Sequence, residues 1–167
     1  MADSIEDLKK NIFDLGGKIS APLSLVSFAD RPTNSGRPHV EMKGGKYHYV
    51  ITEKGEELDR RISDQKEDIL YWIFKDITSE LASEYEQKNR KGSVDFRRLK
   101  FSKQLQLMTD IDLAWGERFS KEIEGILKDY PYDDLMDRRT QYCKTLIGEG
   151  MSGAAAYLKA CEIYPLP

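Results

Sequence analysis

Three side chains of the kinds that bind metals lie close together in the N-terminal third of this sequence. His39, Glu41 and His48 fall in two stretches that alternate between apolar and polar residues, as strands with one buried face do. In a hairpin they would share the outer face, with Glu41 opposite His48. Two imidazoles and a carboxylate on one face are the ligands of a facial metal triad, so a metal-dependent enzyme is one hypothesis. A solvated sheet face is a much more common setting for such residues, and we favour it.

Other catalytic and nucleotide-binding motifs are incomplete. Residues 148–153 match GxGxxG by letter, but the residues before them have helical periodicity, so the glycines fit a tight turn between helices. Gly44-Gly45-Lys46 lacks the Walker spacing, and no GxSxG surrounds any serine. The sequence therefore predicts a protein that is not an enzyme and needs no cofactor.

The alternating stretch predicts a three-stranded antiparallel meander. Gly44-Gly45 is a strong two-residue hairpin signal, and Lys54-Gly55 is read as a second such turn. These turns give the pairs Met42–Tyr47, Val40–Tyr49, Ile51–Leu58 and Tyr47–Ile62. The alternative is that residues 56–62 begin the next helix, and we favour the strand.

Helical periodicity accounts for most of the remaining chain. Apolar residues at helical spacing, with capping and stop signals, predict helices at about 5–15, 64–91, 95–108, 112–130, 135–147 and 152–163. The helix that contains Ile69–Phe74 is expected to be central and buried on more than one side. A loop is expected through Pro22, Pro32 and residues 34–36. The fold class is α+β and mostly α: a helical bundle with a small meander, in a single domain over residues 1–167.

Two groups of residues are candidates for binding a protein partner. In the predicted register, Glu41, His48 and Arg61 form a polar row across the three strands. In the turn at residues 129–137, tyrosines that can anchor an interface alternate with aspartates that can steer a basic partner. The candidate residues of this turn are Tyr130, Tyr132, Asp133, Asp134 and Asp137. For both groups an ordinary solvated surface is the alternative.

Composition narrows the possible partners and the compartment. Hydrophobic residues make up 40% and charged residues 33%, and the net charge of -3 is too small to indicate direct nucleic-acid binding. The longest wholly apolar run, Ile69–Phe74, is far shorter than the roughly 20 residues of a membrane helix. Cys143 and Cys161 lie far apart without CxxC spacing, which is typical of free thiols in a reducing compartment. We expect a soluble cytoplasmic protein that does not bind membranes.

Several motifs together resemble a known family. The runs are Pro38-His-Val-Glu, Tyr47-His-Tyr-Val-Ile-Thr-Glu-Lys-Gly, Leu70-Tyr-Trp-Ile-Phe, Asp95-Phe-Arg-Arg and Trp115-Gly-Glu-Arg. Over roughly residues 36–132 the chain resembles the bacterial immunity protein family 63. It departs from the family at Lys54, where an Arg is expected in a Glu-Arg-Gly turn.

The resemblance implies a function in toxin resistance. Members of this family accompany polymorphic toxins, as in contact-dependent inhibition, and bind the cognate toxin domain in the cytoplasm of the producing cell. Such an inhibitor needs neither cofactor nor turnover. A general protein-binding regulatory module is the further alternative, and the sequence does not fix the oligomeric state.

Overall fold

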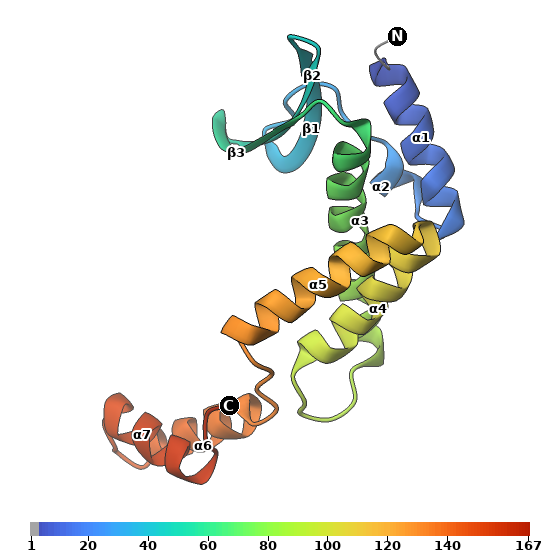
Figure 1. The fold of residues 1–167 in the computed structure, drawn as a ribbon. Coiled ribbons are helices and arrows are strands. Elements are labelled where there is room, and N and C mark those ends of the chain that lie inside the picture. The colour runs from blue at the N-terminus through green and yellow to red at the C-terminus, as the bar shows by residue number, and fades with distance from the viewer. Residues whose placement is uncertain (1–3) are drawn as a thin grey trace. The chain divides into compact units, whose positions relative to one another are not determined.

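A computed structural model describes residues 4–167 (Figure 1). The chain divides into two compact units. The first unit comprises the chain up to Leu81 together with Gln106–Glu117, and the second comprises Ala82–Leu105 together with Arg118–Pro167. The expectation of one domain over residues 1–167 stays a prediction.

The described residues form seven helices and one three-stranded antiparallel sheet. The helices are α1 (Ile5–Lys18), α2 (Leu23–Val26), α3 (Lys66–Asn89), α4 (Phe96–Ile111), α5 (Leu113–Asp129), α6 (Met136–Gly148) and α7 (Gly153–Ile163), and the strands are β1 (Ser35–Lys43), β2 (Lys46–Glu53) and β3 (Glu56–Ser63). The predicted fold class, mostly α with a three-stranded meander, is confirmed. Within residues 4–167, every helix is too short or too polar to cross a lipid bilayer.

Local signals explain where α1 and α5 begin. The Ser4 hydroxyl accepts a hydrogen bond from the Asp7 amide at 3.1 Å, while the Asp7 carboxylate accepts one from the Ser4 amide at 3.0 Å, which completes a capping box at the start of α1. The Asp112 carboxylate likewise accepts hydrogen bonds from the Ala114 and Trp115 amides at 2.8 and 3.3 Å, and this caps α5.

Helix α1 continues to Lys18, three residues beyond the predicted end at about residue 15. Gly16 is buried, and a Cβ atom at this position would lie 2.4 Å from the Val26 side chain. The glycine therefore permits close packing against α2, which itself forms inside the stretch that we expected to be a loop. Lys18 then donates a hydrogen bond to the Ile111 carbonyl at 2.8 Å, which ties the end of α1 to α4.

The register of β1 on β2 is confirmed, but that of β2 on β3 is shifted. Val40 pairs with Tyr49 and Met42 with Tyr47 around the Gly44-Gly45 turn, as predicted. Between β2 and β3 a bulge next to Ile51 places Ile51 opposite Asp59 rather than opposite Leu58. A shift of one residue moves every following side chain to the other face of the strand. Leu58 and Ile62 are therefore exposed instead of facing the core.

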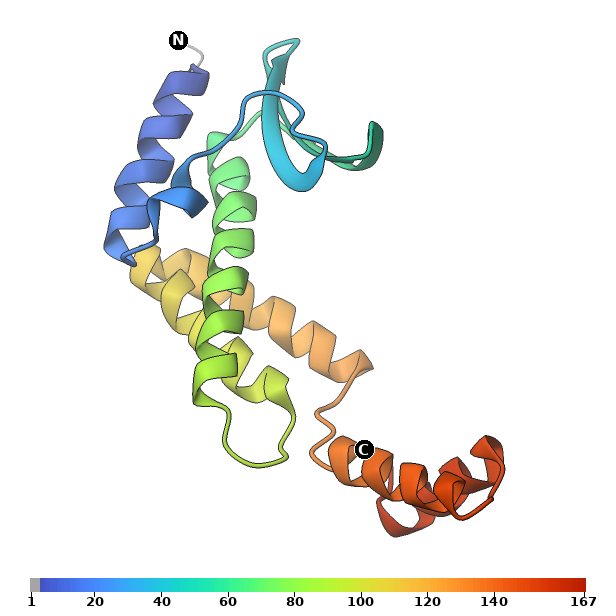
Figure 2. The ribbon, with the colours of Figure 1, turned by 180° about the vertical axis from the view of Figure 1, so that it is seen from behind.

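The core of the first unit lies around α3 (Figure 2). Both views show the sheet beside the N-terminal half of α3 and show α1 alongside the same helix. Ile69, Tyr71 and Phe74 are almost fully buried although they point in different directions around α3, so the expected burial on several sides is confirmed. The Trp115 ring packs against Tyr71 and Phe74 at centroid distances of 6.0 and 5.8 Å.

In the second unit, α6 and α7 form a helical hairpin. Leu146 of α6 and Ala156 and Ala160 of α7 are buried. The turn between the helices is closed by a hydrogen bond from the Met151 amide to the Leu146 carbonyl at 3.0 Å. The GxGxxG letters therefore lie at a turn between two helices, as the helical periodicity indicated.

Candidate functional site

The outer face of the sheet carries a network of ion pairs centred on Arg60. The Arg60 guanidinium donates hydrogen bonds to His48 Nδ1 at 2.9 Å and to Glu41 at 3.3 Å. It also binds Glu57 through two hydrogen bonds of 2.8 and 2.6 Å. A guanidinium that holds two carboxylates and an imidazole fixes all of these side chains in one arrangement.

Glu41 is the most strongly bound carboxylate of this network. Its oxygens lie 2.7 Å from Lys43 Nζ and 3.1 Å from His39 Nε2. The hydrogen bond from Lys43, followed by those from His39 and Arg60, lowers the pKa of Glu41 to about 2 although burial acts in the opposite direction. Glu41 is therefore an anion over the whole physiological pH range.

Arg61 lies on the opposite face from the predicted polar row. Because of the bulge, it pairs with Tyr49, and its guanidinium lies 5.5 Å from the Tyr49 ring centroid and 5.8 Å from that of Trp72. Its Nε also donates to Asp59 at 2.9 Å. The predicted row of Glu41, His48 and Arg61 is wrong, and Arg60 takes the place of Arg61.

His39 was expected on the same solvated face, but the structure buries it completely, with 0% of its surface exposed. The segment before β1 covers this end of the strand: Ala29 forms a parallel bridge with His39, and its carbonyl accepts from the Val40 amide at 3.2 Å. Both oxygens of Glu41 are already engaged, by His39 on one side and by Lys43 and Arg60 on the other. Among residues 4–167 no group of three His, Cys, Asp or Glu side chains is arranged to hold a metal ion.

In the second unit, the turn at residues 129–137 is held by arginines. Asp134 binds Arg98 through two hydrogen bonds of 2.8 Å each, and Asp133 binds the buried Arg139. Tyr132 lies beneath two guanidinium groups, the nearer being that of Arg98, 4.2 Å from the ring centroid. Of the three candidate aspartates of this turn, Asp133 and Asp134 are therefore paired with arginines within the protein.

Asp95 joins this turn to the start of α4, and sequence reasoning did not identify it as part of the site. Its carboxylate accepts hydrogen bonds from the Asp133 amide at 2.9 Å and from the Nε and Nη2 atoms of Arg97. The backbone amide of Asp95 donates to the Asp134 carboxylate at 3.0 Å. Burial raises the pKa of Asp95, but Arg97 and the backbone amides outweigh this and bring it to about 2. Arg97 also donates to the Tyr130 and Pro131 carbonyls, at 2.9 and 2.7 Å. The only available signal was the Asp-Phe-Arg-Arg run at a helix start.

Among the candidate residues of this turn, Tyr130 and Asp137 are the ones exposed to solvent. Tyr130 is 70% exposed, and Asp137 is exposed as well. Next to them, Val94, Phe96 and Met136 are exposed apolar side chains that line, with Asp137, a shallow cavity of about 90 Å³. An exposed apolar cluster bordered by carboxylates is typical of a protein-binding surface.

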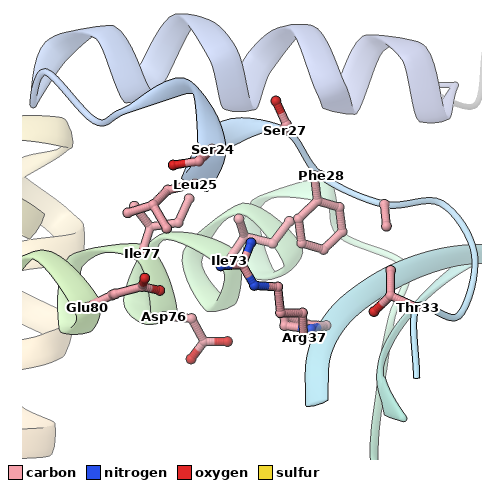
Figure 3. Close-up of a pocket in the computed structure, with 12 residues that line it drawn as sticks. Ser24, Leu25, Ser27, Phe28, Thr33, Arg37, Ile73, Asp76, Ile77 and Glu80 are labelled. Carbon is pink, nitrogen blue, oxygen red and sulfur yellow. The ribbon is translucent and has the colours of Figure 1, made fainter. Parts of the chain in front are cut away.

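A larger cavity lies within the first unit, between α3 and the segment 24–38 (Figure 3). Its volume is about 200 Å³. Ile73 and Ile77 of α3 lie at its base, Phe28 lines the side opposite α3, and the charged residues Arg37, Asp76 and Glu80 border it. Sequence analysis did not predict this cavity, because half of its wall comes from the stretch that we interpreted as a loop.

A comparison with known families shows which proteins the chain resembles. Residues 43–125 match the family model of Immunity protein 63. The resemblance of the chain to immunity protein family 63 is thus confirmed, from the end of β1 to the C-terminal part of α5. His48, Arg60 and the α3 side of the larger cavity lie inside the matched range, whereas Glu41 and the turn at 129–137 lie outside it. No curated protein and no solved structure matches the chain significantly.

Proposed function

We propose that this protein is an immunity protein that binds and neutralises a cognate bacterial toxin domain in the cytoplasm of the cell that makes the toxin. The match to Immunity protein 63 over residues 43–125 is the observation that carries the proposal. Inhibition by binding requires neither turnover nor a cofactor. The protein is accordingly proposed not to be an enzyme, and toxin binding is its whole activity.

Two described surfaces support the proposal because their polar groups are already fixed. On the sheet, Arg60 holds Glu41 and His48 in place, and in the second unit Arg98 and Arg139 hold Asp134 and Asp133. Side chains that are ordered before binding lose little conformational entropy when a partner docks. Such surfaces suit an inhibitor that must bind tightly.

The proposed contacts differ in what they contribute to binding. Tyr130 supplies an exposed aromatic anchor and Asp137 a carboxylate that is free to attract a basic partner. The polar contacts to the toxin domain are proposed to come from side chains that Arg60, Arg98 and Arg139 hold in place. Arg61, on the α3-facing side of the sheet, is a further proposed contact. These polar contacts are Glu41, His48, Tyr132, Asp133 and Asp134.

The required affinity is attainable for a protein of this size. A nanomolar complex corresponds to about 12 kcal/mol of binding free energy. Interfaces that bury roughly 1,600 Å² in total reach this value when a few anchor side chains are fully buried. The accessible surface of 10324 Å² leaves ample area for one such interface.

The test is co-expression with the toxin domain that is encoded immediately upstream of this protein. We expect the two proteins to co-purify as a one-to-one complex, with nanomolar or tighter affinity by calorimetry and with loss of toxin activity. A folded toxin domain that neither binds this protein nor is inhibited by it would contradict the proposal for that pair.

A further inference from the structure

The cavity between α3 and the segment 24–38 has the size of one large side chain. Its volume of about 200 Å³ is below the roughly 300–1,000 Å³ of sites that hold metabolites or cofactors. Ile73 and Ile77, one helical turn apart on α3, form an apolar base, and the Phe28 ring stands beside it (Figure 3). A flexible aliphatic chain would therefore lose water contact along the side that packs on this base.

The border of the cavity is acidic. Asp76 and Glu80 are also one turn apart on α3, and both are exposed to solvent. Asp76 accepts a hydrogen bond from the Tyr49 hydroxyl, whereas the Glu80 side chain has no ion pair or hydrogen bond to any described residue. Arg37 is the only cation among the described lining residues, and it forms no ion pair with either carboxylate. The lining thus holds two carboxylates and one guanidinium, and although Arg61 and Lys75 add positive charge near Asp76, Glu80 has no cation from the described residues bound to it.

An apolar base with carboxylates at the border fits a long side chain that ends in a cation. Arginine fits better than lysine, because its planar guanidinium can bridge two carboxylates and can stack on an aromatic ring such as Phe28. Arginine is also among the residues that most often dominate the energy of protein interfaces. We propose that this cavity is the anchor site for an arginine side chain of the toxin domain. The identity of the partner rests on the function proposed above, whereas the preference for arginine rests on the cavity alone.

The alternative ligand of this cavity is an acidic side chain bound by Arg37. The two occupants predict opposite effects of the variant Arg37→Gln. For an arginine ligand this variant removes a like charge and strengthens binding, whereas for an acidic ligand it removes the only cation and abolishes binding.

The first experiment tests the cavity without the toxin. The probe is N-acetyl-arginine amide, and binding is followed by NMR through the methyl groups of Ile73 and Ile77. We expect saturable shifts at millimolar concentrations. N-acetyl-citrulline amide, which has the same length but no charge, should bind at least tenfold more weakly. Glu80→Gln should weaken arginine binding roughly two- to fivefold, as for other solvent-exposed charge pairs, and Arg37→Gln should strengthen it.

Asp14→Asn is the matched control, because Asp14 is an exposed carboxylate of α1 outside the cavity. It should leave the affinity for the probe unchanged. The inference is overturned if the arginine probe causes no saturable shift or if the citrulline probe binds equally well. It is also overturned if N-acetyl-glutamate amide binds instead and loses its affinity in Arg37→Gln.

The second experiment separates this inference from the proposed function. In the complex with the toxin domain, Asp76→Asn combined with Glu80→Gln should raise the dissociation constant at least tenfold, with Asp14→Asn again as control. If the double variant binds the toxin domain with unchanged affinity, the proposed immunity function stands and the arginine site is overturned. If the unaltered protein does not bind the toxin domain at all, the proposed function fails, and the arginine site is then lost as a toxin contact.

Discussion

The substitution Asp95→Asn should destabilise the protein most at neutral pH and hardly at all in acid. Asparagine has nearly the same shape as aspartate and is an equally good helix N-cap. It therefore retains the hydrogen bond that Asp95 accepts from the Arg97 amide at 2.9 Å. The negative charge facing the Arg97 guanidinium is lost, and so is the oxygen that accepts from the Asp133 amide. The side chain of Asp95 is 4% exposed, so solvent screens this pair only weakly.

The magnitude follows from the pKa of the folded state. The pKa of Asp95 falls from its ordinary value of 3.8 to about 2 in the folded protein. At 1.36 kcal/mol per pH unit, the difference corresponds to about 2 kcal/mol of stability. Because the folded pKa is the lower one, this contribution is fully present above about pH 4 and disappears as the pH falls towards 2.

Urea unfolding followed by circular dichroism, at several pH values from 3 to 7, measures the effect. We expect Asp95→Asn to be about 2 kcal/mol less stable than the unaltered protein at pH 7, and the difference should narrow steadily below pH 4. Asp129→Asn is the control, because Asp129 is an exposed carboxylate with no ion pair or hydrogen bond to another described residue. The reasoning is refuted if Asp95→Asn is as stable as the unaltered protein at pH 7 or if the loss does not depend on pH.

Three further predictions test the packing and the proposed contacts. Gly116→Ala should lower the free energy of unfolding by roughly 1–3 kcal/mol, because the added Cβ would lie 2.2 Å from a threonine hydroxyl of α4. As a control on the same helix, the Cβ of Gly125→Ala meets open space, and this variant should not destabilise the protein in the same urea assay. Arg139→Met should lower the free energy of unfolding by roughly 3–5 kcal/mol, because it leaves Asp133 without its buried partner. Amide hydrogen exchange in α7 should accelerate, and unchanged protection there would contradict the role of this arginine. Tyr130→Ala should weaken toxin binding at least tenfold in calorimetry while leaving the thermal unfolding midpoint unchanged, since the side chain is 70% exposed; unchanged affinity would remove Tyr130 from the interface.

Local signals in the sequence determined the elements of this protein. The Gly44-Gly45 turn and the alternation on either side of it gave the register of β1 on β2, because a two-residue turn fixes which residues face each other. Asp112 marked the start of α5, and Pro131 followed the end of the same helix. Each of these features depends on hydrogen bonds and backbone angles within a few residues, which is the range that a sequence pattern describes.

The motif resemblance also acquires a physical reason in the structure. In Trp115-Gly-Glu-Arg, the tryptophan packs against Tyr71 and Phe74, and Gly116 allows α5 to approach Thr109 closely. These residues stabilise the core rather than form a binding surface. The motifs therefore pointed to the family that the chain resembles, but they did not locate a binding site.

Contacts between distant segments decided the rest. Because of the bulge in β3, Arg60 rather than Arg61 lies beside Glu41, and no residue in the turn itself signals such a bulge. Whether His39 faces solvent depended on Ala29, which lies ten residues earlier in a stretch without periodicity. The charge of the acidic turn depended on arginines that are distant in sequence, including Arg98. A sequence pattern states which side chains share a face of one element, but which segment covers that face is decided only when the chain has folded.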